Sequence, residues 1–340
     1  MRYLHGKYDK HSLFSWSTGC QTDCGKSREK GRQDMSKDTQ KYLLSLALFG
    51  SNGIVASLIE LPSSLVVLCR VALGAALLVA LVALSRSARQ NLQTPRHPKQ
   101  AALLAASGAA LGVAWLFLFD AYSYVGVSVA SLLFYCGPVI VMALSPIVFG
   151  TRLTASKLAG FAAVVVGAFL VVGQGLGQGI SPMGLVLGGM SAVMYAAMVI
   201  LSKKVTDITG VESSALQLCG AFAAVAVYLG ATGATGNPVL PSAAELASLN
   251  VPAVLCIGLV NTGFGCYLYF SSMSGLPVTR VAVCGYLEPL SAVVLSAVIL
   301  GEPMTAANVL GAALILGGAI YSELSEKLVA RRQARKLAAA

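Results

Sequence analysis

Long apolar stretches, separated by short polar segments, follow one another along this chain from residue 41 to residue 323. A helix needs roughly 20 apolar residues to cross a bilayer, and ten stretches approach that length. They lack the alternating apolar and polar residues that are typical of membrane β-strands. The pattern predicts an all-α integral membrane protein with ten transmembrane helices, over residues 41–60, 63–84, 100–119, 126–148, 155–173, 182–202, 213–231, 251–271, 277–300 and 305–323.

The chain also contains an internal duplication. Residues 135–167 align without a gap on residues 286–318, at an offset of 151 positions, and ten of the 33 pairs are identical. Each copy extends to five expected helices, so the second copy must cross the membrane in the opposite sense. We therefore expect two inverted repeats, over 41–173 and 182–324, an arrangement typical of secondary transporters. Tyr135/Tyr286, Pro138/Pro289, Gly150/Gly301, Gly160/Gly311 and Gly167/Gly318 are among the identical pairs.

The distribution of charge predicts how the expected helices are oriented in the membrane. The 340 residues have a formal net charge of +10, with 24 Lys and Arg. If the N-terminus is cytoplasmic, all of them except Arg70 fall in or beside segments on the cytoplasmic side, as the positive-inside rule requires. The charge is thus a topology signal, and no nucleic acid is expected as a partner. We expect both termini in the cytoplasm and the protein in the cell (cytoplasmic) membrane.

Polar tails flank the expected helices. Residues 1–40 have no apolar periodicity and are expected to be a disordered cytoplasmic tail. Met35 is an alternative start, with residues 1–34 as an upstream extension. Residues 325–340 form a basic cytoplasmic tail.

Motifs of enzymes and metal proteins are missing from the sequence. There is no phosphate loop of the form GxxxxGK[ST] and no HExxH. The eight cysteines include six in apolar spans, and Cys20 and Cys24 match no common zinc spacing. We expect no enzyme activity, no metal and no cofactor.

Several short motifs carry a family resemblance over about residues 41–324. The chain resembles EamA-type members of the drug/metabolite transporter (DMT) superfamily. The resemblance implies ten helices in two inverted repeats, a central cavity lined by helices 1, 3, 4, 6, 8 and 9, and alternating access. Thr151-Arg152 departs from the family, where many members have an acidic residue. The motifs are Phe49 to Asn52, Arg70, Ala121 to Tyr124, Leu287-Glu288-Pro289, Leu300-Gly301-Glu302 and Gly311 to Gly318.

Two charged residues lie well inside the expected spans, away from the ends. Glu288 would either bind a cationic group of a solute, carry a coupling proton, or accept structural hydrogen bonds beside Pro289. Arg70 would either attract an anionic solute or tie helix 2 to a carboxylate or to backbone carbonyls. Because helix 2 is not expected to line the cavity, the structural role of Arg70 is favoured.

Polar and aromatic residues complete the candidate cavity. Asn52 and Asn261 would bind a solute or join two helices. Tyr135 and Tyr286 are equivalent residues of the two copies, whose rings would stack on a ligand. Trp115, Tyr195 and Tyr267 are further candidates that suit packing equally well. Paired helix breaks are expected at Gly137, Pro138 and Pro289, because proline removes a helical hydrogen bond.

These patterns favour a secondary transporter, most simply an exporter of small organic solutes such as amino acids, metabolites or drugs. The drive would be a proton gradient or the gradient of the solute. The alternatives are an uptake carrier or exchanger of the same fold, and a non-transporting membrane scaffold. An exchanger of nucleotide-linked solutes usually needs several cavity cations, whereas a scaffold needs no paired helix breaks. The expected partners are a solute, the lipid bilayer and possible coupling protons, in a monomer or a homodimer.

Overall fold

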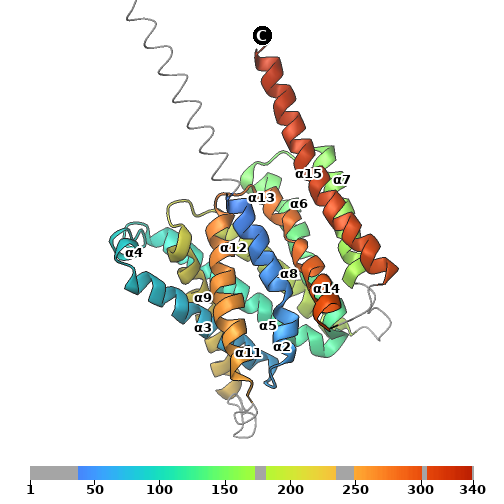
Figure 1. Ribbon diagram of the computed structural model, residues 1–340. Coiled ribbons are helices and arrows are strands. Elements are labelled where there is room, and N and C mark those ends of the chain that lie inside the picture. The colour runs from blue at the N-terminus through green and yellow to red at the C-terminus, as the bar shows by residue number, and fades with distance from the viewer. Residues whose placement is uncertain (1–36, 173–180, 235–248, 301–304, 339–340) are drawn as a thin grey trace, which may run out of the picture.

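The computed structural model describes residues 37–172, 181–234, 249–300 and 305–338. Throughout these residues the regular secondary structure is helical, without a strand (Figure 1). Six helices in this part of the chain are long and apolar enough to cross a membrane, and three shorter apolar helices accompany them. The prediction of an all-α membrane protein is therefore confirmed, whereas ten membrane crossings remain a prediction.

Most helices coincide with the expected apolar stretches. The first stretch is helical over residues 37–50 and again in α2 (Asn52–Ser57). A short helix, α4 (Arg86–Gln90), lies in the polar loop after the second stretch. Single helices cover the second, fifth, sixth and seventh stretches, namely α3 (Ser63–Leu84), α7 (Ala155–Val172), α8 (Pro182–Lys203) and α9 (Gly210–Ala234).

The eighth and ninth stretches are composite. Each contains a wide π-helical segment, a local form that is frequent at functional sites. The eighth consists of α11 (Val251–Leu255), η2 (Cys256–Phe264) and α12 (Gly265–Met273). The ninth consists of α13 (Val278–Cys284), α14 (Leu287–Leu295) and η3 (Ser296–Leu300).

The third and fourth stretches differ from expectation, because helix α5 (Pro98–Phe134) runs through the expected connection between them. The segment from residue 120 to 134 contains no proline and one glycine, so little in it ends a helix. The chain nevertheless reverses. Ser107 bonds to the carbonyl of Met198 in α8, Gly184 packs on Val125, and Gly188 packs on Leu133. The early part of α5 is therefore antiparallel to α8, and its last turns are parallel.

Two helix interruptions occupy nearly equivalent positions of the two copies. Helix α5 ends at Phe134 and α6 (Gly137–Phe149) begins three residues later, with proline in its first turn. In the second copy, α13 ends at Cys284 and α14 begins at Leu287, just before Pro289. Proline fits the first turn of a helix because the amide it lacks would have no partner there.

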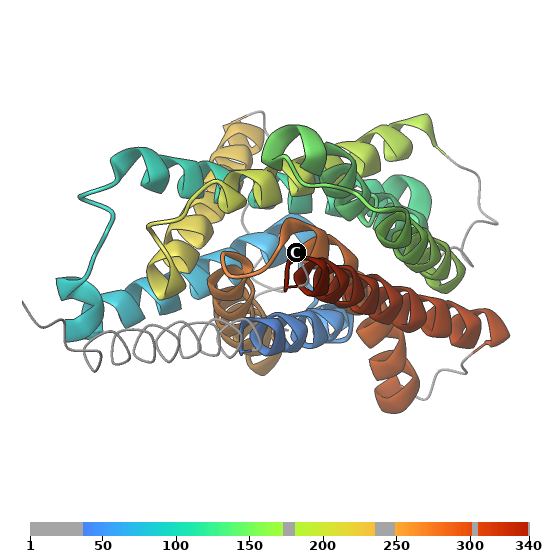
Figure 2. The ribbon, with the colours of Figure 1, turned by 90° about the horizontal axis from the view of Figure 1, so that it is seen from above.

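The helices form two layers (Figure 2). The middle of the chain, from α5 to α9, makes one layer, and segments from both ends of the chain make the other. Helix α7 packs across the layers on α15 (Ala306–Ala338), beside which it lies in Figure 1. Glycines allow the close approach, because a Cβ added at Gly318 would lie 2.5 Å from the carbonyl oxygen of Gly160. One added at Gly167 would lie 2.6 Å from that of Gly311, so the two helices are antiparallel.

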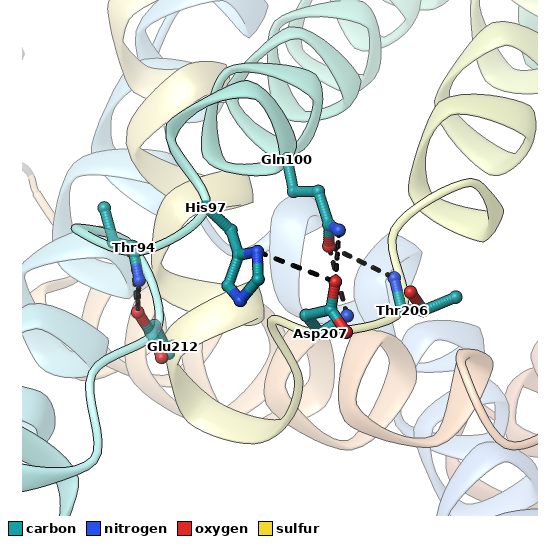
Figure 3. A network of polar contacts seen from close by, with 6 residues as sticks. All are labelled: Thr94, His97, Gln100, Thr206, Asp207 and Glu212. Atoms are coloured by element: carbon teal, nitrogen blue, oxygen red, sulfur yellow. Dashed lines mark hydrogen bonds and ion pairs between the residues drawn. The ribbon is translucent and has the colours of Figure 1, made fainter.

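Several polar loops meet at the end of the bundle that carries α4. The carboxylate of Glu212 accepts hydrogen bonds from the amides of Gln93 and Thr94, of which Figure 3 draws the bond from Thr94. Asp207 accepts a bond from Gln100 and lies 3.7 Å from Nδ1 of His97. These contacts connect the loop before α5 to the loop between α8 and α9.

The ends of the chain differ in part from the expected tails. Residues 37–40 are helical rather than disordered, because they form the first turn of an apolar helix. Helix α15 continues past residue 323 to Ala338. Its extension is rich in Ala, Leu, Lys, Arg and Glu, which are strong helix formers. The rest of the N-terminal tail, with Cys20 and Cys24, and residues Gly301 and Glu302 of the family motif lie outside the described residues.

Candidate functional site

Glu288 lies at the centre of the candidate site. It is in the first turn of α14, directly after the helix interruption, and its amide bonds to the carbonyl of Gly285. The side chain is enclosed by helices from both layers, yet part of its surface is accessible. Five tyrosines from four other segments of the chain lie within electrostatic range of its carboxylate, namely Tyr42, Tyr122, Tyr135, Tyr195 and Tyr269.

Arg70 brings a positive charge close to this carboxylate. The side chain is 4% exposed, and the charges of Arg70 and Glu288 attract each other. Its Nε atom donates to the hydroxyl of Thr262 at 3.0 Å, and its guanidinium carbon lies 4.2 Å from the ring centroid of Trp115. Arg70 is thus held by a hydroxyl and an aromatic face. The carboxylate or carbonyl partners expected for a structural arginine are not among its described contacts.

Tyrosines join three helices beside Glu288. The hydroxyls of Tyr195 in α8 and Tyr269 in α12 lie 2.9 Å apart. The ring of Tyr42, which is fully buried, lies 5.1 Å from the ring of Tyr269, and its hydroxyl donates to the carbonyl of Val281. Tyr195 also covers Gly137, where an added Cβ would lie 2.6 Å from the tyrosine ring.

Sequence reasoning missed Tyr42, Tyr122 and Tyr269. For Tyr269, helical periodicity offered a signal, because residues four and eight positions apart share one helix face. Tyr269 is eight positions after Asn261, whereas the predicted Tyr267 is six positions after it and points elsewhere. The ring of Tyr267 is half-buried and packs near Phe264, with centroids 6.4 Å apart.

Tyr135 and Tyr286 meet between the two copies. The hydroxyl of Tyr286 donates to the backbone carbonyl of Tyr135 at 2.6 Å, and the ring centroids are 6.4 Å apart. Pro138 is buried, and its ring lies near Gly285, at 3.8 Å from the position of an added Cβ. Both helix interruptions therefore lie together beside Glu288.

The two predicted asparagines bind each other. The amide nitrogen of Asn261, in the π-helix η2, lies 3.1 Å from the side-chain oxygen of Asn52. It also donates to the hydroxyl of Ser51 and to the carbonyl of Leu48. Asn52 directly follows a one-residue break in the first helix. The pair thus joins the first and eighth apolar stretches, and Asn261 is 2% exposed.

Metal-binding chemistry has no support in the part of the chain that the structure describes. No group of three His, Cys, Asp or Glu side chains there is arranged to hold a metal ion. Cys69, Cys219, Cys256 and Cys266 are free thiols. Tyrosine, asparagine, arginine and glutamate side chains suit the recognition of a small polar solute better than covalent chemistry.

The long apolar helices define an integral membrane protein, and polar groups from several of them meet in its interior. The chain matches the EamA-like transporter family over residues 42–173 and 182–323, and it belongs to that family. It is 24% identical over 284 residues to the uncharacterized transporter YxxF of Bacillus subtilis, covering 82% of this chain and 86% of the relative. It is 27% identical over 209 residues to a probable amino-acid metabolite efflux pump of Salmonella typhimurium, covering 59% and 69%.

A solved crystal structure shares the fold. It matches 88% of this chain and 99% of its own length with a TM-score of 0.70, at 21% sequence identity. The two matched family segments also reproduce the two expected repeats closely. The chain is therefore a multi-pass membrane transporter built from two EamA repeats.

Proposed function

We propose that this protein is a secondary transporter that exports small organic solutes, such as amino acids, metabolites or drugs, by alternating access. The observation that carries the proposal is the position of Glu288. A carboxylate inside a membrane protein is costly and is retained mainly where it binds a solute or an ion. Glu288 is enclosed between both helix layers, beside the two interruptions, and keeps accessible surface.

Inverted repeats would supply the two conformations, and the packing of α7 on α15 supports them. Gly311 is the equivalent of Gly160 in the second copy, and Gly167 is the equivalent of Gly318 in the first, each 151 positions away. The contact between Gly160 and Gly318 is therefore equivalent to the contact between Gly311 and Gly167. Contacts that exchange in this way indicate a twofold relation between the copies. Because α7 and α15 are antiparallel, such an axis would be perpendicular to the helices and would lie in the membrane plane. Repeats related in this way can open the site alternately to each side.

The end that carries α4 is the proposed cytoplasmic end. It gathers Gln100, Asp207 and Lys203, whose ammonium donates to the carbonyl of Met273 at 2.6 Å. An added Cβ at Gly275 would touch Asp38, which places the start of the first helix at this end as well. All of these residues lie in or next to segments assigned to the cytoplasm from the distribution of Lys and Arg.

Export of an amino acid or related metabolite is favoured by the Salmonella relative, which is described as a probable amino-acid metabolite efflux pump. In the proposed site, Glu288 would either bind a cationic group of the solute or carry a coupling proton. Tyr135, Tyr195 and Tyr286 would contact the solute, and the interruptions at Gly137, Pro138 and Pro289 would act as hinges.

The test is flux of labelled amino acids and metabolites in proteoliposomes. Wild type and Glu288→Gln are compared with and without an imposed pH gradient. Glu60→Gln, an exposed acid in the short loop between α2 and α3, is the matched control. A pH gradient that drives wild-type flux, but leaves Glu288→Gln with downhill exchange only, identifies Glu288 as the proton carrier.

Other results are equally decisive. Equal flux in both proteins without any effect of pH would make Glu288 structural and the protein a facilitator. Flux of wild type that ignores pH, with a raised half-saturation concentration in Glu288→Gln, would assign Glu288 to the solute. No flux of any labelled solute in either direction would contradict the proposed function.

A further inference from the structure

The guanidinium of Arg70 has a buried nitrogen, Nη2, without a hydrogen-bond partner among the described residues. Nε donates to Thr262 at 3.0 Å, and the plane lies over Trp115 at 4.2 Å. Nη2 is fully buried and makes no hydrogen bond to the described residues. Helices α3, α5 and η2 therefore hold the group in place but leave one buried donor without a hydrogen-bond partner.

Such a donor is costly when it stays empty. A buried polar group that loses its hydrogen bond costs about 1–3 kcal/mol, and a charged group costs more. Glu288 is the acid that attracts Arg70, but the two do not form a contact pair. The described ion pairs within 4.0 Å are Lys41 with Asp38 and His97 with Asp207. The opposite charges of Arg70 and Glu288 thus attract each other across the region between them without direct neutralisation.

The charges restrict what can fill that region. Together Arg70 and Glu288 are neutral when both are ionised, so a solute with a net charge would leave that charge uncompensated in an apolar interior. A phosphate dianion would also be repelled by Glu288. A solute that carries one carboxylate and one ammonium leaves no net charge. Guanidinium groups suit carboxylates because their donors form a planar fork.

We propose that Arg70 forms a carboxylate-binding subsite of the transport site, with Glu288 as the partner for the ammonium of the same solute. The favoured substrate class is therefore a net-neutral amino-acid zwitterion. Thr262 and Trp115 are positioning residues, because they orient the guanidinium and leave Nη2 free. This inference rests on the proposed function. It gives Arg70, in α3, a solute-binding role, whereas the sequence favoured a structural role because the second expected helix was not expected to line the cavity.

Trp115 gives the subsite its own optical signal. The chain has two tryptophans, Trp16 and Trp115, so Trp16→Phe leaves a single fluorophore stacked on Arg70. The full-length protein in lipid vesicles is titrated with a mixture of the non-aromatic L-amino acids. A second titration uses the corresponding L-amino-acid amides, which keep the ammonium and lack the carboxylate. The amino acids should change the fluorescence of Trp115 saturably, and the amides should not.

Three variants separate the roles. Arg70→Lys keeps the charge but loses the fork and the stacking, so we expect the half-saturation concentration to rise roughly ten- to hundredfold. Thr262→Val keeps Arg70 and removes its hydrogen-bond partner, so we expect a rise of at least about threefold. If Arg70→Lys fails to fold, Thr262→Val by itself tests the Arg70 subsite. Arg152→Lys, an exposed arginine after α6, is the control and should titrate like wild type.

Counterflow of the labelled amino-acid mixture in the same vesicles distinguishes the two proposals. Two results would leave transport standing and contradict the Arg70 subsite, provided that the vesicles carry amino acids. In the first, the amides change the fluorescence of Trp115 as the amino acids do. In the second, Arg70→Lys and Thr262→Val both have the half-saturation concentration of wild type. An absent response of Trp115 to the amino acids also overturns the subsite. If wild-type vesicles carry no solute of the wider labelled panel, the proposed function itself is wrong.

Discussion

The hydroxyl of Tyr286 donates a hydrogen bond to the backbone carbonyl of Tyr135, 2.6 Å away. The two residues are equivalent in the two copies, 151 positions apart. Among the described contacts, the hydroxyl of Tyr135 makes no matching bond to Tyr286. The relation is therefore asymmetric, and it satisfies a carbonyl at the interruption between α5 and α6 that has lost its regular helical setting.

This asymmetry predicts different effects of removing the two hydroxyls. We expect Tyr286→Phe to lower the free energy of unfolding by about 1 kcal/mol, because the carbonyl of Tyr135 loses its partner. Tyr135→Phe removes the equivalent hydroxyl without breaking a described hydrogen bond, and it should unfold like wild type. Thermal unfolding in detergent measures both, and equal destabilisation of the two variants would contradict the asymmetry.

Neighbouring glycines in α15 offer a second test. An added Cβ at Gly318 would lie 2.5 Å from the carbonyl oxygen of Gly160, whereas one at Gly317 meets nothing within 4 Å. We expect Gly318→Ala to destabilise the protein by about 1–3 kcal/mol through overpacking. Gly317→Ala should be neutral or slightly stabilising, since alanine favours helix more than glycine does. Equal unfolding midpoints for the two variants would show that α7 and α15 are not packed this closely.

Substitution of Asn261 tests whether the pair of Asn261 and Asn52 binds solute or joins two helices. Its amide nitrogen is used by Leu48, Ser51 and Asn52, so we expect a structural role. Asn261→Leu should lower stability by about 1–2 kcal/mol, the range for polar contacts between membrane helices. The half-saturation concentration for transport should stay near the wild-type value. A raised half-saturation concentration at unchanged stability would instead place Asn261 in the solute site, and Asn52→Ala serves as the partner variant.

Glu212 holds the loop before α5 in place through hydrogen bonds. Its carboxylate accepts bonds from the amides of Gln93 and Thr94 and from the hydroxyl of Thr94, the last at 2.6 Å. Hydrogen bonds to a charged acceptor contribute about 1.5–3 kcal/mol. We expect Glu212→Ala to lower the hydrogen-exchange protection of residues 91–97 by roughly tenfold or more. Glu60→Ala is the control, and unchanged exchange in Glu212→Ala would mean that the contacts of His97 and Gln100 suffice to hold the loop.

Helix bounds were most predictable where polar residues or prolines flank an apolar run. The second stretch was expected at 63–84, and α3 spans Ser63–Leu84, between Pro62 and Ser85. Helix through residues 120–125 was not anticipated, because a polar segment suggested a loop although nothing in it forbids helix. Tyr269 was missed for a related reason. Spans were assigned from hydrophobicity, which does not say which face of a helix turns inward.

The sequence by itself determined the all-helical membrane class, the duplication and the membership of a transporter family, because hydrophobic length, charge and repetition are properties of contiguous residues. Only the tertiary structure decided which polar groups meet. Arg70 reaches Thr262 across 192 positions, and Asn261 reaches Asn52 across 209. Such contacts depend on how each helix is rotated about its axis, on its interruptions and on its π-helical turns. These features arise from packing between layers, which no local pattern of residues encodes.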